Sequence, residues 1–308
     1  MATAFVFPGQ GSQKVSMGHD LFMSSKVGKK YFDLANKIME IDIQSIIFNG
    51  PEEKLKETQY TQPAIYIVSV ILGHILLEKG LQPDMVAGHS LGEYSACTLA
   101  GSLTFKTGLS LVKLRAESMQ DAGITNPGTM AAIIGMTDED VISMCNTISS
   151  DESVVVAANF NSPGQVVISG NINAVHEAME KARDLGARIA KELNVSGAFH
   201  SPLMEPAKKR LSAALDTIEI NTATMPVYAN VTAQPTTEAD ELRLNLKNQL
   251  DFPVKWHKTI NNMKTAGATE MMEIGPGRVL QGLTRRIDKK LISKGVETLE
   301  QIEEIAHV

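Results

Sequence analysis

Cysteine is scarce in this sequence of 308 residues, and negative charge outnumbers positive charge. The two cysteines, Cys97 and Cys145, are far apart and match no CxxC or metal-ligand spacing, so we expect buried, reduced thiols and no metal site. The formal net charge of -6 argues against nucleic acid as a general partner. With 43% hydrophobic and 21% charged residues, the composition is that of an ordinary globular protein of about two domains.

An uninterrupted apolar run long enough for a membrane span is also missing. The first residues, Met1–Val6, contain no basic segment, and the longest apolar stretch, 64–77, is broken by four residues: Tyr66, Ser69, Gly73 and His74. We therefore expect neither export nor a membrane-spanning helix, and a cytoplasmic location.

A complete dinucleotide-binding fingerprint is absent as well. The expected strand 3–7 runs into the glycine-rich turn 8–13, but G-x-G-x-x-G would need glycine where Lys14 stands. The sequence therefore favours a turn that presents backbone N–H groups over a nucleotide site.

A G-x-S-x-G motif at 88–92 is the strongest functional signal in the chain. An expected buried strand, 85–87, precedes it, and an expected helix, 91–99, follows. This setting is typical of a nucleophile elbow, in which a sharp turn exposes Ser90. The alternative is an ordinary glycine-rich turn.

Arg115 lies on the apolar side of the expected helix 103–121. The polar face of that helix holds other residues, namely Lys106, Ser110, Lys113, Glu117 and Gln120. A buried guanidinium suits a carboxylate ligand bound by two hydrogen bonds. The alternatives are a structural ion pair with an internal Asp or Glu, or a side chain that reaches out to solvent.

Residues 127–195 show a distinct pattern of expected strands and helices, which predicts an inserted domain. The order is β-α-β-β-α-β, as in ferredoxin-like modules, with expected strands at 129–136, 154–158, 165–169 and 187–195. Thr137 is expected to cap the first helix and Asn173 the second. Residues 1–126 and 196–308 then form a discontinuous α/β body, which continues with five expected segments: the loop 197–202, the strand 225–231, the helix 238–249, the strand 269–274 and the terminal helix 278–287.

A serine hydroxyl needs a base within hydrogen-bond reach, and seven histidines compete for that role. His200 is the leading candidate because it lies on an irregular loop at the end of an element. His74 is expected in the core, and His89 is expected to point away from the turn. The other four are expected on the small domain, on the surface or at the terminus: His19, His176, His257 and His307.

Eight ordered motifs together resemble malonyl-CoA:acyl carrier protein transacylases, from Phe5 to about Ile287. They are FPGQGSQ (7–13), TQPA (61–64), GHSLGEYSA (88–96), Arg115 with Met119-Gln120, NSPGQVVISG (161–170), GAFHS (197–201), Gln249-Leu250 with PVKW (253–256), and EIGPGRVL (273–280). The resemblance implies an α/β-hydrolase-like body with an inserted ferredoxin-like domain. It also implies transfer of malonyl from malonyl-CoA to the phosphopantetheine thiol of acyl carrier protein in fatty-acid synthesis.

The resemblance also implies the roles of individual residues. Ser90 is the nucleophile, His200 the base, and the main-chain carbonyl of Gln249 holds the imidazole. The remaining residues fall into two groups: Gln10 and Leu91 supply oxyanion N–H groups, and Arg115 binds the malonyl carboxylate in a pocket lined by Met119, Asn161 and Phe199. No metal or other cofactor is implied, and we expect a monomer.

Two other functions stay open on the residues alone. An esterase or thioesterase would use the same elbow with water as acceptor, and Asp121 or Asp184 could be its acid in the order Ser, Asp, His. A non-catalytic acyl- or nucleotide-binding protein would leave Ser90 and His200 structural. For an acidic carrier, the candidate docking sites are two basic clusters, 208–210 and 285–290.

Overall fold

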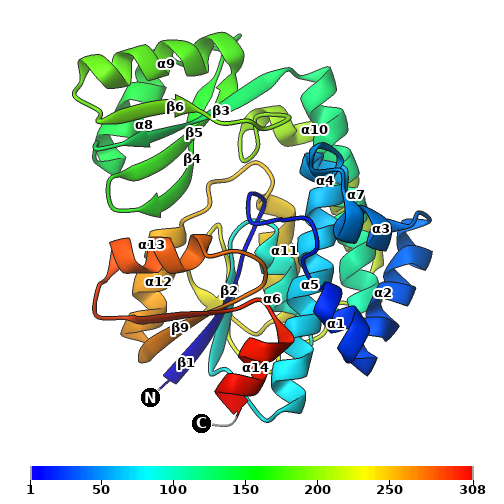
Figure 1. Cartoon of the computed structure of the whole chain (residues 1–308). Coiled ribbons are helices and arrows are strands. Elements are labelled where there is room, and N and C mark those ends of the chain that lie inside the picture. The colour runs from blue at the N-terminus through cyan, green and yellow to red at the C-terminus, as the bar shows by residue number, and fades with distance from the viewer. Residues whose placement is uncertain (1, 307–308) are drawn as a thin grey trace.

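The computed structural model describes residues 2–306 and contains two β-sheets, one above the other in Figure 1. The larger sheet has the strand order β10-β9-β1-β2-β7-β8. All neighbours in it are parallel except β7 and β8, which are antiparallel. Its strands are β1 (Ala2–Phe7), β2 (Met85–Gly88), β7 (Val227–Tyr228), β8 (Pro235–Thr236), β9 (Ala268–Ile274) and β10 (Ile292–Val296).

The two faces of the larger sheet are both buried, as is typical of parallel strands. Side chains alternate along β1, so that Phe5 and Phe7 join one apolar cluster while Ala4 and Val6 join another. The first and larger cluster lies under α5 (Thr58–Glu78), α6 (Gly92–Leu99) and α7 (Phe105–Thr125). The second lies under α12 (Trp256–Thr265) and α13 (Val279–Ile287).

The helix α5 is apolar almost all round because it lies inside the body. By length and composition it could cross a membrane, but 83% of its most apolar window is buried within the protein. Such a helix is typical of the core of a large domain. Shorter helices surround it and complete this side: α1 (His19–Ser24), α2 (Lys26–Met39), α3 (Ile43–Asn49), α4 (Glu52–Lys56), α10 (Glu205–Thr217), α11 (Ala239–Asn248) and α14 (Leu299–Ala306).

The smaller sheet is antiparallel and has the strand order β4-β5-β3-β6. Its strands are β3 (Gly128–Ile134), β4 (Val155–Ser162), β5 (Gln165–Asn171) and β6 (Ile189–Glu192). Two helices, α8 (Asp138–Ile148) and α9 (Ile172–Asp184), cover one face and share a separate apolar core with it. Figure 1 shows this unit in green above the body, with its other face turned toward the body.

Most of the expected elements are present, with three corrections. Thr137 caps α8 as expected, but α9 begins at Ile172, and Asn173 is not its cap. The residue at that N-cap is Asn171, whose side chain instead accepts a hydrogen bond from the Val154 backbone N–H at 2.8 Å. The strand expected at 225–231 shortens to β7, because the chain turns back into the short antiparallel β8.

The third correction concerns the C-terminus. Helix α13 is not terminal, because β10 and α14 follow it. β10 is an edge strand with only Val296 buried, so its apolar signal in the sequence is weak. Cys97 and Cys145 are free and buried, as expected. His307 lies outside the described residues.

Candidate active site

Ser90 occupies a sharp turn between β2 and α6, with a φ of 50° in the left-handed region. The flanking glycines are required by close contacts. A Cβ on Gly88 would lie 1.8 Å from the carbonyl carbon of Gly92, and a Cβ on Gly92 would lie 2.1 Å from the carbonyl oxygen of Phe7. Left-handed backbone at a non-glycine residue costs free energy and persists where the surrounding structure enforces it. The turn therefore has the geometry of a nucleophile elbow.

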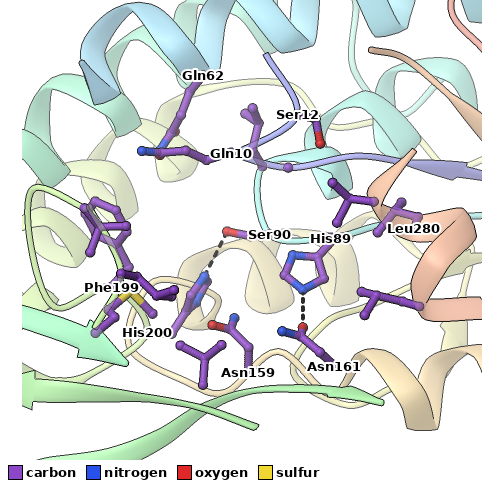
Figure 2. Close-up of a pocket in the computed structure, with 18 of the residues that line it drawn as sticks. Gln10, Ser12, Gln62, His89, Ser90, Asn159, Asn161, Phe199, His200 and Leu280 are labelled. Carbon is purple, nitrogen blue, oxygen red and sulfur yellow. Dashed lines mark hydrogen bonds between the residues drawn. The ribbon is translucent and has the colours of Figure 1, made fainter. Parts of the chain in front are cut away.

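The imidazole of His200 lies directly against the serine. Its Nε2 is 2.8 Å from Ser90 Oγ, and its Nδ1 is 2.8 Å from the main-chain oxygen of Gln249 (Figure 2 shows the first contact). A carbonyl can only accept, so Nδ1 carries the proton and Nε2 is free to accept the serine proton. The arrangement suits a general base.

His200 is 3% exposed, and this burial lowers its pKa to about 3, with the nearby charge of Arg115 as the second cause. The imidazole is therefore neutral at neutral pH. A neutral imidazole is the form that can take a proton from Ser90.

Arg115 is fully buried, and its guanidinium meets only neutral acceptors. Nη1 donates to Gln62 Oε1 at 2.6 Å, while Nη2 donates to Ser90 Oγ at 3.0 Å and to Gln249 Oε1 at 2.9 Å. Nε has no hydrogen-bond partner within residues 2–306. Burial lowers the pKa of Arg115, opposed by the acidic groups of Tyr94 and Glu93. No carboxylate contacts this cation in the described chain, so the alternative of a direct structural ion pair is wrong.

A cavity of about 210 Å³ opens beside Ser90, between the body and the smaller sheet. Figure 2 shows Gln10 and Gln62 on one side of it and Asn159 and Asn161 on the other. The body and the small sheet therefore build the site together. The wall includes several residues singled out in the sequence: Gln10, Ser90, Leu91, Met119, Asn161, Phe199 and His200.

Arg115 is not part of the cavity wall, but it bonds to two residues that are. A ligand would reach the guanidinium by replacing its contact with Gln62 Oε1 or with Ser90 Oγ. Gln62 also donates from Nε2 to Met119 Sδ at 3.4 Å. Gln62 therefore stands between the cavity and the buried cation.

Gln10 and Leu91 both line the cavity beside Ser90. Within residues 2–306 neither of their backbone N–H groups donates a hydrogen bond to another protein group. Unpaired donors next to a nucleophile are what an oxyanion requires.

His89 points away from the Ser90 hydroxyl, as expected, but it still lies on the cavity wall. Its Nε2 donates to Asn161 Oδ1 at 2.8 Å, and its ring packs 5.4 Å from that of Trp256. Burial lowers the pKa of His89. His74 is half-buried against the ring of Tyr31, close to the core position expected.

Neither acid considered for an esterase triad lies at His200. Asp121 forms an ion pair with Arg210 at 2.7 Å, and Asp184 lies on α9 of the small sheet. The imidazole is instead held by the carbonyl of Gln249.

Two site residues received no role from the sequence. Asn230, which follows β7, accepts from the Ser90 backbone N–H at 2.7 Å and donates to the Gly88 carbonyl at 2.6 Å, so it clamps both sides of the elbow. Gln62 lies in the TQPA motif, and a buried glutamine on an apolar helix must have polar partners. That rule could have pointed to Gln62, whereas no local pattern marks Asn230.

The basic cluster at 208–210 is occupied by acidic partners. Lys208 pairs with Asp251 at 2.9 Å, Lys209 with Glu205 at 3.2 Å, and Arg210 with Asp121 at 2.7 Å. In the second cluster, Arg285, Lys289 and Lys290 are exposed, and none of them forms an ion pair within the described chain. The second cluster therefore retains more free positive charge.

Comparison with known proteins agrees with this geometry. Residues 4–300 match the family model described as the acyl transferase domain. The malonyl CoA-acyl carrier protein transacylase of Bacillus subtilis is 41% identical over 300 residues, which cover 97% of this chain and 95% of the relative.

Two solved structures are similar over almost the whole chain. The malonyl CoA-acyl carrier protein transacylase of Coxiella burnetii has a TM-score of 0.95 and 38% identity, covering 99% of this chain and 97% of the other. A malonyl-transacylase in complex with its type II PKS acyl-carrier protein also has a TM-score of 0.95 and 38% identity, covering 100% and 99%. With these matches, the chain belongs to the acyl transferase family and, within it, to the malonyl CoA-acyl carrier protein transacylases.

Proposed function

We propose that this chain transfers the malonyl group from malonyl-CoA to the phosphopantetheine thiol of acyl carrier protein through a malonyl ester of Ser90. The observation that carries the proposal is the convergence of two groups on one oxygen. Ser90 Oγ lies 2.8 Å from the neutral imidazole of His200 and 3.0 Å from the guanidinium of Arg115. A base and a carboxylate-binding cation beside one nucleophile suit an acyl group that carries a carboxylate.

In the first half-reaction, His200 Nε2 takes the Ser90 proton as Oγ attacks the thioester carbonyl of malonyl-CoA. The oxyanion accepts from the N–H groups of Gln10 and Leu91, and loss of one such donor typically costs about 3–4 kcal/mol of the barrier. The proton returns through His200 to the CoA sulfur as the C–S bond breaks. The Gln249 carbonyl keeps the imidazole in the required tautomer throughout.

The second half-reaction reverses these steps with a different thiol. His200 takes the proton of the phosphopantetheine thiol, whose sulfur attacks the ester carbonyl, and Ser90 leaves with the proton restored. Such a route predicts ping-pong kinetics.

Arg115 is proposed to bind the malonyl carboxylate, and Met119, Asn161 and Phe199 to shape the space around it. The carboxylate would replace the neutral acceptors Gln62 Oε1 on Nη1 and Ser90 Oγ on Nη2, which gives the buried cation a bidentate anionic partner. Phe199, 6% exposed on the cavity wall, would crowd the carbon between the two carbonyl groups.

We assign residues 1–126 and 196–308 to an α/β-hydrolase-like body and 127–195 to a ferredoxin-like domain. The strand order β6-β3-β5-β4 supports the second part, since it corresponds to the order 4-1-3-2 of the β-α-β-β-α-β unit. The elbow after a parallel strand supports the first. A monomeric, cytoplasmic enzyme remains the expectation.

Acyl carrier protein is expected to dock near α13, because Val279, Leu280 and Leu283 of that helix line the cavity. The exposed cations Arg285, Lys289 and Lys290 lie at and just beyond the end of the same helix. This cluster is a better candidate than 208–210, whose charges are paired.

The proposal is tested by intact mass after the enzyme is mixed with malonyl-CoA in the absence of carrier. We expect a malonyl adduct that persists and is absent from Ser90→Ala. Rapid return to the free enzyme with release of malonate would support the esterase instead. No adduct at any time would support a non-catalytic binding protein.

A further inference from the structure

A buried carboxylate beneath the elbow has no part in the mechanism above. Glu93 lies in the first turn of α6 and is 1% exposed, three residues after the nucleophile. Its burial raises its pKa to about 7, opposed by hydrogen bonds from Gln249 and Asn230 and by the charge of Arg115. A buried carboxyl group is costly unless its hydrogen bonds serve the surrounding structure.

The contacts of Glu93 are made with the two residues that support Ser90, Gln249 and Asn230. Glu93 Oε2 accepts from Gln249 Nε2 at 2.5 Å and from the Asn230 backbone N–H at 3.3 Å. Asn230 clamps the elbow through its own side chain. Glu93 therefore lies at the centre of a polar layer below the nucleophile.

Glu93 and the Ser90 carbonyl together determine which end of the Gln249 amide faces Arg115. The Ser90 carbonyl can only accept, so the Gln249 NH₂ group must face it, at 2.9 Å, and the same NH₂ group donates its second hydrogen to Glu93 Oε2. The amide oxygen is then left to accept from Arg115 Nη2 at 2.9 Å. With the amide reversed, an NH₂ group would face the guanidinium, and the contact would be donor against donor.

The same guanidinium nitrogen donates to Ser90 Oγ at 3.0 Å, so the position of Arg115 relative to the acyl ester depends on this amide. The other nitrogen of the Arg115 guanidinium, Nη1, donates to Gln62 Oε1, a contact that a bound carboxylate would replace. Once a carboxylate replaces that contact and the contact with Ser90 Oγ, Gln249 Oε1 is the protein acceptor that still orients the guanidinium.

We propose that Glu93 is a positioning residue that sets the preference for acyl groups bearing a carboxylate: by holding the Gln249 amide, it holds Arg115 beside Ser90. This inference rests on the proposed malonyl transfer. The base is held by the main-chain carbonyl of Gln249, so loss of Glu93 affects the cation more than the imidazole.

The test compares Glu93→Ala and Glu93→Gln with the wild type in single-turnover loading from malonyl-CoA and, separately, from acetyl-CoA. Glu93→Ala is expected to lower the malonyl-to-acetyl ratio of loading rates about 10-fold, the size expected for one lost hydrogen bond in a charged network. Glu93→Gln is expected to restore most of the ratio, since its amide oxygen can accept from Gln249. The ratio is measured on one preparation, so a lower folded fraction does not change it.

Glu273→Ala is the matched control. Glu273 is equally buried, and the hydrogen bonds that its side chain accepts within residues 2–306 come from Leu280 and Gln281 of α13, not from Gln249 or Arg115. It should lower the thermal stability and leave the malonyl-to-acetyl ratio unchanged. If Glu93→Ala does not fold, Gln249→Met replaces it, because it removes the amide bridge and keeps the carbonyl that holds His200.

Three results would overturn the inference: an unchanged ratio in Glu93→Ala, an unchanged ratio in Gln249→Met, or a Glu93→Gln variant as impaired in the ratio as Glu93→Ala. The malonyl adduct of the wild-type enzyme distinguishes failure of the role of Glu93 from failure of the proposed function. A wild type that forms no malonyl adduct removes the function itself, whereas a normal adduct with unchanged ratios removes only the role of Glu93.

Discussion

Arg115 and the cations at 208–210 carry charge of the same sign in opposite surroundings. Arg115 is fully buried on α7 and donates only to neutral oxygens. The cations at 208–210 lie on α10, and each is paired with a carboxylate. Desolvation makes the unpaired charge of Arg115 costly and favours binding of an anion to it. The cations at 208–210 already have carboxylate partners in or near water.

The availability of a charged group to an anion therefore depends on its partners more than on its exposure. A run of basic residues in a sequence suggests an anion-binding surface, yet here the run is neutralised in place. A single arginine on the apolar face of a helix gives a weaker sequence signal, yet it is the cation that has no anionic partner within residues 2–306.

Replacement of Arg115 by alanine should have the largest effect. The rate of malonyl loading should fall roughly 100- to 1000-fold. This fall corresponds to a barrier about 3–4 kcal/mol higher, as expected when one partner of a buried charge pair is removed. Acetyl loading should be spared or improved, because acetyl has no carboxylate. Arg115→Lys should recover only part of the loss, since a point charge lacks the paired donors.

The matched control is Lys208→Ala, which removes a compensated cation and should leave both loading rates nearly unchanged. Both acyl groups are measured as initial rates of adduct formation on Ser90. Equal loss of malonyl and acetyl loading in a folded Arg115→Ala protein would show that the arginine is structural.

The buried site should also select acyl groups by their shape, which an exposed cluster of cations cannot do. Phe199 lies on the cavity wall beside the base, so malonyl should be preferred over methylmalonyl. One methyl group in a tight pocket is worth about 1–3 kcal/mol, roughly 10- to 200-fold. Competition between the two CoA esters measures the ratio of their specificity constants. Phe199→Ala should bring this ratio closer to one. Similar specificity constants in the wild type would disprove the steric argument.

The charge of Arg115 should also be visible in the pH dependence of the base. The pKa of His200 is lowered to about 3, chiefly by burial and secondly by Arg115. In the unfolded chain the histidine titrates near 6.5, so the stability gained from a neutral His200 is present above about pH 6.5 and is lost as the pH falls toward 3.

Arg115→Ala should raise the pKa of His200, because one of the two main causes is removed. The acidic limb of the acetyl-loading rate should therefore move to higher pH in this variant, while it stays in place in Lys208→Ala. Acetyl is the right probe since its binding does not use the arginine. A limb that does not move would mean that burial alone sets this pKa.

Charge reversal on α10 should have the smallest effect. Lys208→Glu with Lys209→Glu is expected to change the transfer rate to carrier protein only a few-fold at low salt, because both lysines are already paired. Reversal of Arg285 and Lys289 should slow transfer more, with little change in loading from malonyl-CoA. A larger effect from the α10 pair would reverse the assignment of the docking surface.

The elements of the site that lie in local motifs could be predicted from the sequence. Ser90 was marked by its flanking glycines, and both glycines prove to be required by contacts. The apolar side of α7 predicted the burial of Arg115. His200 led the histidines only by its place on a loop, and the family resemblance was needed to give it a role.

The supporting layer could not be predicted, because its contacts join residues far apart in the chain. Asn230 reaches Ser90 from 140 positions away, and Gln249 reaches Glu93 from 156 positions away. Nothing local distinguishes these side chains from solvated ones. The misplaced cap at Asn173 has a similar cause, since the neighbouring Asn171 is fixed by a contact with Val154 across the sheet.

The most direct test of serine-mediated transfer uses isolated malonyl-enzyme, freed of CoA and mixed with holo-acyl carrier protein or with buffer alone. The account predicts rapid discharge onto the phosphopantetheine thiol, with slow loss to water, and a modified peptide that contains Ser90 before discharge. Equal rates of loss with and without the carrier, or a malonyl group mapped to another residue, would contradict it.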